Sequence, residues 1–172
     1  GWTPERFGFL VISSQTLKTD LATFGGERRL SYIKPVGLQT ALQQAPQDLA
    51  EKINQAGGFS MVMLSPSIFA QGYLPEWIDA QTFKGTLPNT EVQVQLKAVA
   101  IDRWLAVSGW DSIVWKPKAT RKAVSAGSMY WFEVLSPISQ SMVQQLWTAS
   151  LADHEQDRRD GFGMVVLAAW NK

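Results

Sequence analysis

The chain has 172 residues, of which 45% are hydrophobic and 18% charged, and its formal net charge is +1. This composition is that of a folded domain and argues against disorder. A net charge so close to zero also excludes binding of nucleic acid or anionic lipid through bulk charge, so a polyanion site must be a local patch. The lack of cysteine excludes disulfides and thiolate nucleophiles, and one histidine excludes a pair of histidine metal ligands.

Hydrophobic periodicity and turn residues predict the elements in chain order. The first 36 residues are rich in β-prone runs, one of them at 7–12, and the pair Gly25-Gly26 favours a tight turn between strands. The later elements that the patterns predict are a strand at 29–36, a helix at 46–56, strands at 59–65, 91–102 and 128–135, a helix at 138–151 and a strand at 163–170.

The clearest pattern in the chain lies at 91–100. Small and apolar residues alternate there with polar ones, which predicts a half-buried strand with every second residue on one face. The residues expected on that face are Val92, Val94, Leu96, Ala98 and Ala100. Prolines and glycines predict little regular structure at 66–90, and 104–127 is expected to be irregular.

If one strand is set aside as an addition, the order becomes β-α-β-β-α-β, the split β-α-β arrangement of ferredoxin-like domains. We therefore expect one α+β domain over 1–172. Its sheet is expected to be antiparallel, with two helices on one face and long insertions between strands. The longest apolar run, 164–170, is far shorter than the roughly 20 residues that span a bilayer, so no membrane partner is expected.

The residues that could carry catalysis are few. His154 lies in a charged segment and is either a solvated surface residue or the general base of an endoribonuclease. Asp153, Glu155 and Asp157 alternate like the start of a calcium loop, but Gly161 comes too late and no glutamate follows at the twelfth position. We therefore predict no metal, no cofactor and no catalytic residue.

A basic run at 116–122 is the strongest binding signal. It holds four cations and no acid, and Pro117 favours an extended chain, beside Trp110 and Trp115. The run is either a solvated face or a contact for a single-stranded nucleic acid, because aromatic rings and cations together favour such strands. The segment Gly161-Phe162-Gly163 precedes a strand rather than a helix, so it is either a turn or a loop whose amides meet an RNA phosphate.

Several blocks of the sequence together resemble one known family. They are Phe24-Gly25-Gly26-Glu27-Arg28-Arg29, Leu64-Ser65-Pro66-Ser67-Ile68-Phe69 with Gly72-Tyr73-Leu74-Pro75, Ser108-Gly109-Trp110-Asp111, Lys116-Pro117-Lys118, Ala126-Gly127-Ser128-Met129-Tyr130-Trp131-Phe132, and Asp160-Gly161-Phe162-Gly163 with Trp170. In this order they are similar to the guide-RNA-end subunit of the type III-B CRISPR (Cmr) effector complex, a member of the RAMP superfamily. The resemblance covers the C-terminal part of a family member, so we expect Gly1 to be internal to a longer protein.

The resemblance implies a non-catalytic, cytoplasmic subunit in antiviral defence. Such a subunit binds the 5′ repeat-derived end of CRISPR RNA and contacts the large polymerase-like subunit and the backbone RAMP subunits. Two alternatives remain open: a CRISPR RNA-processing endoribonuclease with His154 as its base, and a purely structural interaction domain. The residues predicted to bind RNA are Gly25, Gly26, Arg28, Arg29, Lys116, Lys118, Arg121, Lys122, Gly161, Phe162 and Gly163.

Overall fold

The computed structural model describes residues 15–23, 30–35 and 44–170, and it divides the chain into two compact units, Gly1–Thr40 and Ala41–Lys172. In the first unit, β1 (Asp20–Thr23) pairs antiparallel with β2 (Leu30–Ile33). The predicted strand at 29–36 is thus present as β2. The predicted run at 7–12 and the predicted turn at Gly25-Gly26 lie outside the described residues.

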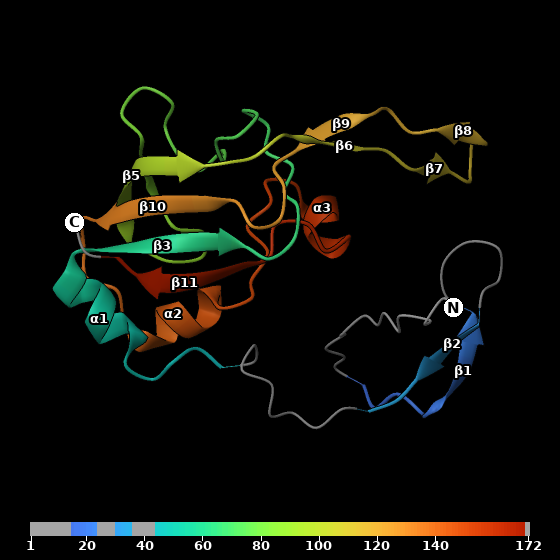
Figure 1. Cartoon of the computed structure of the whole chain (residues 1–172), viewed down its shortest axis with the longest axis horizontal. Helices are drawn as coiled ribbons and strands as arrows, with labels where there is room; N and C mark the ends of the chain where they lie inside the picture. Colours follow the sequence, from blue (N-terminus) through green and yellow to red (C-terminus); the bar gives the residue numbers. More distant parts are fainter. Residues whose placement is uncertain (1–14, 24–29, 36–43, 171–172) are drawn as a thin grey trace, which may run out of the picture. The chain divides into compact units, whose positions relative to one another are not determined.

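The second unit is built on a five-stranded antiparallel sheet with the order β11-β3-β10-β5-β4 (Figure 1). Its strands are β3 (Gly58–Met63), β4 (Lys84–Thr86), β5 (Gln93–Ala100), β10 (Met129–Val134) and β11 (Val165–Ala169). Its helices are α1 (Leu49–Ala56), α2 (Gln140–Leu146) and α3 (Glu155–Arg159). The prediction of an α+β fold with an antiparallel sheet is confirmed. None of the helices in the described part of the chain is long and apolar enough to span a bilayer.

One face of this sheet carries the core. Phe59 of β3 stacks on Phe132 of β10 with ring centroids 5.2 Å apart, and Tyr130 follows on the same face. All three side chains are fully buried, and Ile53 of α1 and Val143 of α2 pack into the same cluster. Burial of large aromatic side chains is the main stabilising contribution to such a core. The core in turn holds together the sheet from which the long inter-strand segments extend.

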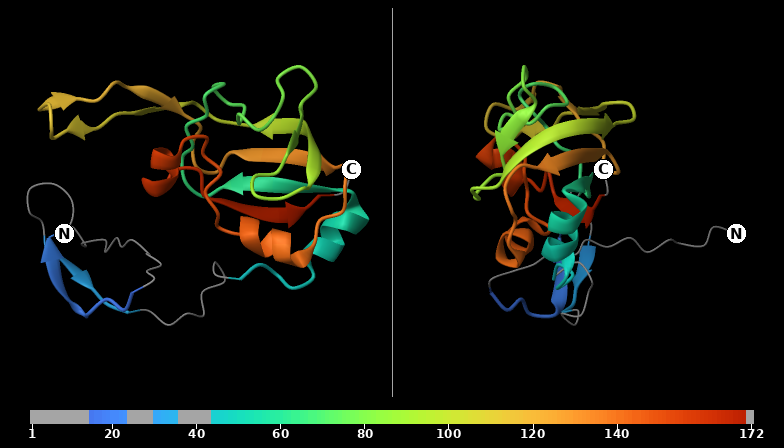
Figure 2. Two further views of the ribbon diagram at one scale, coloured as in Figure 1. Left: turned by 180° about the vertical axis from the view of Figure 1, so that it is seen from behind. Right: turned by 90° about the vertical axis from the view of Figure 1, so that its left-hand side faces the viewer.

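The helices α1 and α2 lie side by side against the sheet near β3 and β11 (Figures 1 and 2). Polar side chains lock their register. Asn54 of α1 donates to the carbonyl of Ile138 and accepts from its amide, at 2.8 and 3.0 Å. Gln140 of α2 accepts from the amide of Ala50 at 3.1 Å. Because these bonds satisfy backbone groups at the helix starts, they replace the missing cap at α1.

The alternation predicted along 91–100 fails halfway. Leu96 pairs with Phe132, but Ala98 pairs with Trp131, so β5 carries an extra residue at Lys97. Phe132 and Trp131 point to opposite faces, and Leu96 and Ala98 therefore do so as well. The prediction that one face holds all five apolar residues is wrong beyond Leu96, because a bulge shifts the register.

The strand connections differ from the expected β-α-β-β-α-β unit. The strand β3 runs parallel to β5, with β10 between them, and residues 64–92 that join β3 to β5 contain no helix. The strands β10 and β11 are likewise parallel, with α2 in their connection. The expected first strand, β2, pairs with β1 instead of a sheet strand, so α1 precedes the first strand of the sheet rather than following it.

The second predicted helix is also too long. It was expected to reach 151, but α2 ends at Leu146, where Trp147 turns to an extended conformation and Thr148 adopts a φ of 58°. The chain then pairs with the entry to β11, since the Thr148 amide donates to the carbonyl of Val165 at 2.8 Å. The helix ends because the backbone after Leu146 pairs with the start of β11. The spacing of apolar residues, from which the longer helix was predicted, does not reveal such pairing.

Candidate nucleic-acid interface

A long β-hairpin carries the predicted basic run. Residues 102–124, here called the hairpin, leave the sheet after β5 and return before β10, and the hairpin projects from the sheet (Figures 1 and 2). Its inner strands are β6 (Leu105–Val107) and β9 (Arg121–Ala123), and its outer strands are β7 (Trp110–Asp111) and β8 (Lys116–Pro117). The segment is therefore regular, where sequence patterns predicted an irregular stretch.

The tip of the hairpin is closed by Asp111. Its Oδ1 accepts hydrogen bonds from the amides of Val114 and Ile113, at 3.1 and 2.9 Å. These two bonds lower the pKa of the Asp111 carboxyl below its ordinary value. An aspartate that binds its own chain two and three residues on is a strong turn former. The turn therefore presents Ile113, Val114 and Trp115 outward.

Large apolar side chains cover the hairpin. Trp115 is 76% exposed and Ile113 is 89% exposed, and Trp104 and Trp110 are exposed by more than half. Groups of exposed aromatic residues such as these mark interaction sites on protein surfaces. The Nζ atom of Lys122 lies 5.0 Å from the centroid of the Trp104 ring, so this ring already holds a cation over its face.

Three lysines of the hairpin are exposed and lie outside the salt bridges of the described residues. Lys116, Lys118 and Lys122 are exposed, and none of them forms a salt bridge with a residue in the described part of the chain. The backbone of Lys118 is fixed in the hairpin, because its amide donates to the carbonyl of Gly109 at 2.8 Å. Cations beside exposed tryptophans make a surface suited to a phosphate backbone with unstacked bases.

The fourth cation of the run, Arg121, has a different role. It donates from Nη1 and Nη2 to the two carboxylate oxygens of Asp157 in α3, at 2.9 and 2.7 Å. The Asp157 side chain is buried, and its hydrogen bond raises the pKa of Arg121 above the ordinary value. That Arg121 contacts RNA stays a prediction. In the structure, its pairing with Asp157 fixes the hairpin to α3.

The ion pair places Arg121, at the inner end of the basic run, near the predicted glycine loop, which follows α3 in the chain. In that loop the amides of Gly161, Phe162 and Gly163 donate to the carbonyls of Arg158, Asp157 and Pro66, at 3.2, 3.0 and 2.8 Å. A Cβ at Gly163, whose φ is 81°, would lie 2.5 Å from the amide nitrogen of Ala152. Since the three amides are used inside the protein, the geometry favours a turn over a phosphate-binding loop.

The acidic residues around His154 face separate partners. His154 precedes α3 and is exposed, and its side chain makes no cap hydrogen bond. Asp153 accepts from the amides of Ala70 and Glu76, and Asp157 pairs with Arg121. Within residues 15–23, 30–35 and 44–170, no group of three acidic, histidine or cysteine side chains could hold a metal ion.

The remaining predicted residues divide into two sets. Gly25, Gly26, Arg28 and Arg29 lie outside the described residues. The lysines of the hairpin and the glycine loop belong to neighbouring parts of one unit, through Arg121 and α3. Sequence analysis missed Trp104 and Ile113 as surface residues. The signal that could have found them is the density of tryptophan and lysine within 104–122. Lysine is rarely buried, so apolar residues among several lysines are expected to be exposed.

The fold and the hairpin define an α+β protein with an exposed basic and aromatic arm. Residues 9–170 match the family described as CRISPR-associated protein (Cas_Cmr3). The chain belongs to this Cmr3 family and is thus a CRISPR-associated subunit of the type III-B Cmr complex. The resemblance noted in the sequence is confirmed by this match. A search among curated proteins finds no match to the chain.

Replacing Arg121 with alanine tests the anchor of the hairpin. The substitution leaves the buried Asp157 carboxylate without its partner, so we expect the free energy of unfolding to fall by about 1–3 kcal/mol. Urea denaturation measures this loss, and hydrogen exchange should become faster at the amides of β6 and β9. The matched control is Lys118→Ala, which removes the same charge from an exposed side chain that forms no salt bridge in the described part of the chain. Equal effects of the two substitutions would contradict the anchoring role.

Proposed function

We propose that this chain is a non-catalytic subunit of a type III-B effector complex that binds the 5′ repeat-derived end of CRISPR RNA. The observation that carries the proposal is the hairpin, with Lys116, Lys118 and Lys122 exposed beside Trp104 and Trp115. The proposed setting is the cytoplasm during antiviral defence, in contact with the large polymerase-like subunit and the backbone RAMP subunits. Membership of the Cmr3 family supports this setting.

The charge distribution supports RNA as the ligand of the hairpin. The net charge of the chain is only +1, so long-range attraction to a polyanion is weak. The run at 116–122 nevertheless concentrates four cations, of which only Arg121 forms a salt bridge among the described residues. A single strand could place its phosphates along these lysines and stack its bases on the exposed indoles.

We also propose that the five-stranded sheet is a variant of the ferredoxin-like RAMP fold. The four strands β11, β3, β10 and β5, which are antiparallel to their neighbours, correspond in their order to the four strands of that fold. The strand β4 extends the sheet at its edge. The connection from β10 to β11 keeps its helix, α2. The first connection has exchanged its helix for residues 64–92, and α1 fills the place beside α2 from the other side of β3.

A triple substitution of the hairpin lysines tests RNA binding. Each phosphate contact with a single strand contributes about 0.7 to the slope of log affinity against log salt concentration, so Lys116→Ala, Lys118→Ala and Lys122→Ala together should flatten the slope by about 2. Affinity should fall for all sequences alike, because phosphate contacts do not read bases. The measurement is binding of 5′-tagged guide RNA at several salt concentrations.

The control carries the same loss of charge elsewhere, as Lys52→Ala, Lys84→Ala and Lys97→Ala. If this control flattens the slope as much as the hairpin variant does, a diffuse charge effect replaces the proposed site. An unchanged slope in the hairpin variant would favour the structural interaction domain, in which the basic run is a solvated face.

An assay with repeat RNA separates the proposal from the endoribonuclease alternative. We expect no cleavage, because His154 is exposed and no other group near it is arranged as an acid or a base partner within the described residues. The assay follows the length of end-labelled repeat RNA with and without divalent metal. Cleavage that disappears in a His154→Ala variant would overturn the non-catalytic role.

A further inference from the structure

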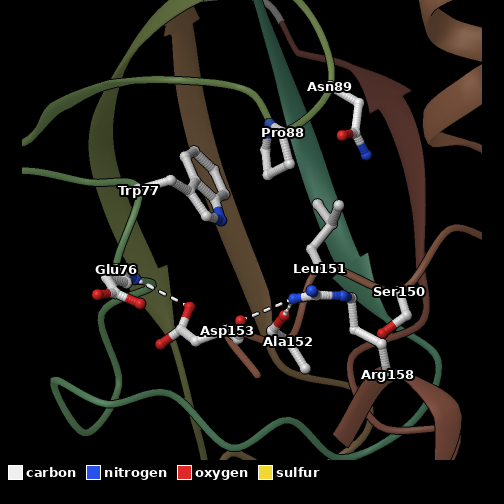
Figure 3. Close-up of a pocket in the computed structure, with 9 residues that line it drawn as sticks. All are labelled: Glu76, Trp77, Pro88, Asn89, Ser150, Leu151, Ala152, Asp153 and Arg158. Carbon is white, nitrogen blue, oxygen red and sulfur yellow. Dashed lines mark hydrogen bonds between the residues drawn. The ribbon is translucent and has the colours of Figure 1, made fainter. Parts of the chain in front are cut away.

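A cavity of about 400 Å³ lies between two insertions of the sheet and α3 (Figure 3). This volume falls within the range of roughly 300 to 1,000 Å³ that is usual for small-molecule sites. Its apolar wall includes Trp77, Pro88 and Leu151, and its charged residues are Glu76, Asp153 and Arg158. None of these residues belongs to the hairpin, so the cavity is a separate feature of the same unit.

Trp77 in the wall of the cavity carries a buried donor without a partner. Its indole Nε1 is shielded from solvent and has no hydrogen-bond partner. The ring is held in place by Phe132, at 5.6 Å between centroids. Figure 3 shows the indole nitrogen on the side of the ring that faces Arg158. Because this atom is sealed from solvent, Trp77 meets a ligand through its ring, which forms part of the apolar wall, and its N–H signal reports on the packing of that wall.

The charged side chains of the cavity are already oriented. The Asp153 carboxylate accepts from the amides of Ala70 and Glu76, at 2.7 and 3.0 Å. Arg158 donates from Nη1 to the carbonyls of Ala152 and Asp153, at 2.6 and 2.7 Å. Its Nε and Nη2 atoms donate to no other described residue. The cavity therefore offers donors from Arg158 together with carboxylate acceptors.

We propose that this cavity binds a single nucleobase, and guanine best. A base has flat faces for the apolar wall and an edge that carries both donors and acceptors. The O6 and N7 atoms of guanine can accept from the free donors of Arg158, which is the commonest specific pairing of arginine with a base. The N1 and N2 hydrogens of guanine can donate to the Glu76 carboxylate, which has no partner among the described residues.

The base can come from RNA or from a free nucleotide. The RNA source rests on the proposed function, and one connection supports it. Arg158 lies next to Asp157 in α3, and Asp157 binds Arg121 of the hairpin. A strand held along the base of the hairpin therefore passes the helix that lines the cavity, and one nucleotide could turn out of the strand into it.

Nuclear magnetic resonance of the full 172-residue chain tests the proposal. The indole N–H signal of Trp77 is assigned by its loss in Trp77→Phe, which keeps an aromatic ring on Phe132. We expect GMP to shift this signal, with AMP, CMP and UMP weaker. Glu76→Gln should weaken GMP binding about tenfold, because it removes a charge-assisted acceptor. The control Glu91→Gln changes an exposed glutamate outside the cavity and should leave GMP binding unchanged.

A second arm with 5′-tagged guide RNA distinguishes the sources of the base. A Trp77 shift with this RNA that GMP reverses supports the RNA source. A shift with GMP but not with RNA supports a free nucleotide, and the cavity site then stands even if the hairpin binds no RNA. If neither RNA nor any of the four nucleotides moves the signal, the inference is overturned. RNA binding that depends on the hairpin lysines would in that case leave the proposed function standing.

Discussion

The pairing of Arg121 with Asp157 is the contact on which the arrangement of the candidate surfaces depends. It joins the inner strand of the hairpin to α3 by two charge-assisted hydrogen bonds at 2.9 and 2.7 Å. Backbone bonds between Ser67 and Val124 fix the base of the hairpin from the other side. Since a two-stranded arm has little stability of its own, these contacts decide how the outer lysines are presented.

The backbone of Asp157 also holds the glycine loop close to α3. The carbonyl of Asp157 accepts from the amide of Phe162, and Gly163 then passes close to the backbone of Ala152. Ala152 lies beside Asp153, whose carboxylate shapes the cavity through the amides of Ala70 and Glu76. The hairpin, the loop and the cavity thus share one short charged helix, so a change in α3 reaches all three.

Much of the sheet could be predicted from the sequence, and the reasons are local. The strands at 58–63 and 129–134 are apolar and β-prone, and the stop of α1 at Gly57 follows from a residue that readily adopts a φ of 72°. The bulge at Lys97 and the early end of α2 could not be predicted, because both are set by pairing with a distant strand. The pairing of β2 with β1, rather than with a strand of the five-stranded sheet, could not be predicted either, because the order of the elements does not show which strands pair.

The candidate site was predicted less completely than the fold. The concentration of lysine and tryptophan at 104–122 indicated the surface, but only the structure separates the exposed Lys118 from the ion-paired Arg121. The segment Gly161-Phe162-Gly163 drew attention through its composition, whereas its amides bind carbonyls of the protein itself. The cavity at Trp77 has no sequence signal, since its residues come from three segments that the fold brings together.

The central claim is that the hairpin holds the guide RNA, and crosslinking tests it most directly. The chain is assembled with the other subunits of its Cmr complex around a guide RNA with photoreactive nucleotides in the 5′ repeat-derived end, and the crosslinked peptides are identified by mass spectrometry. The account predicts crosslinks within 102–124, centred on Trp104, Trp115 and the exposed lysines. Efficient crosslinking of this chain that leaves 102–124 unmodified would contradict it.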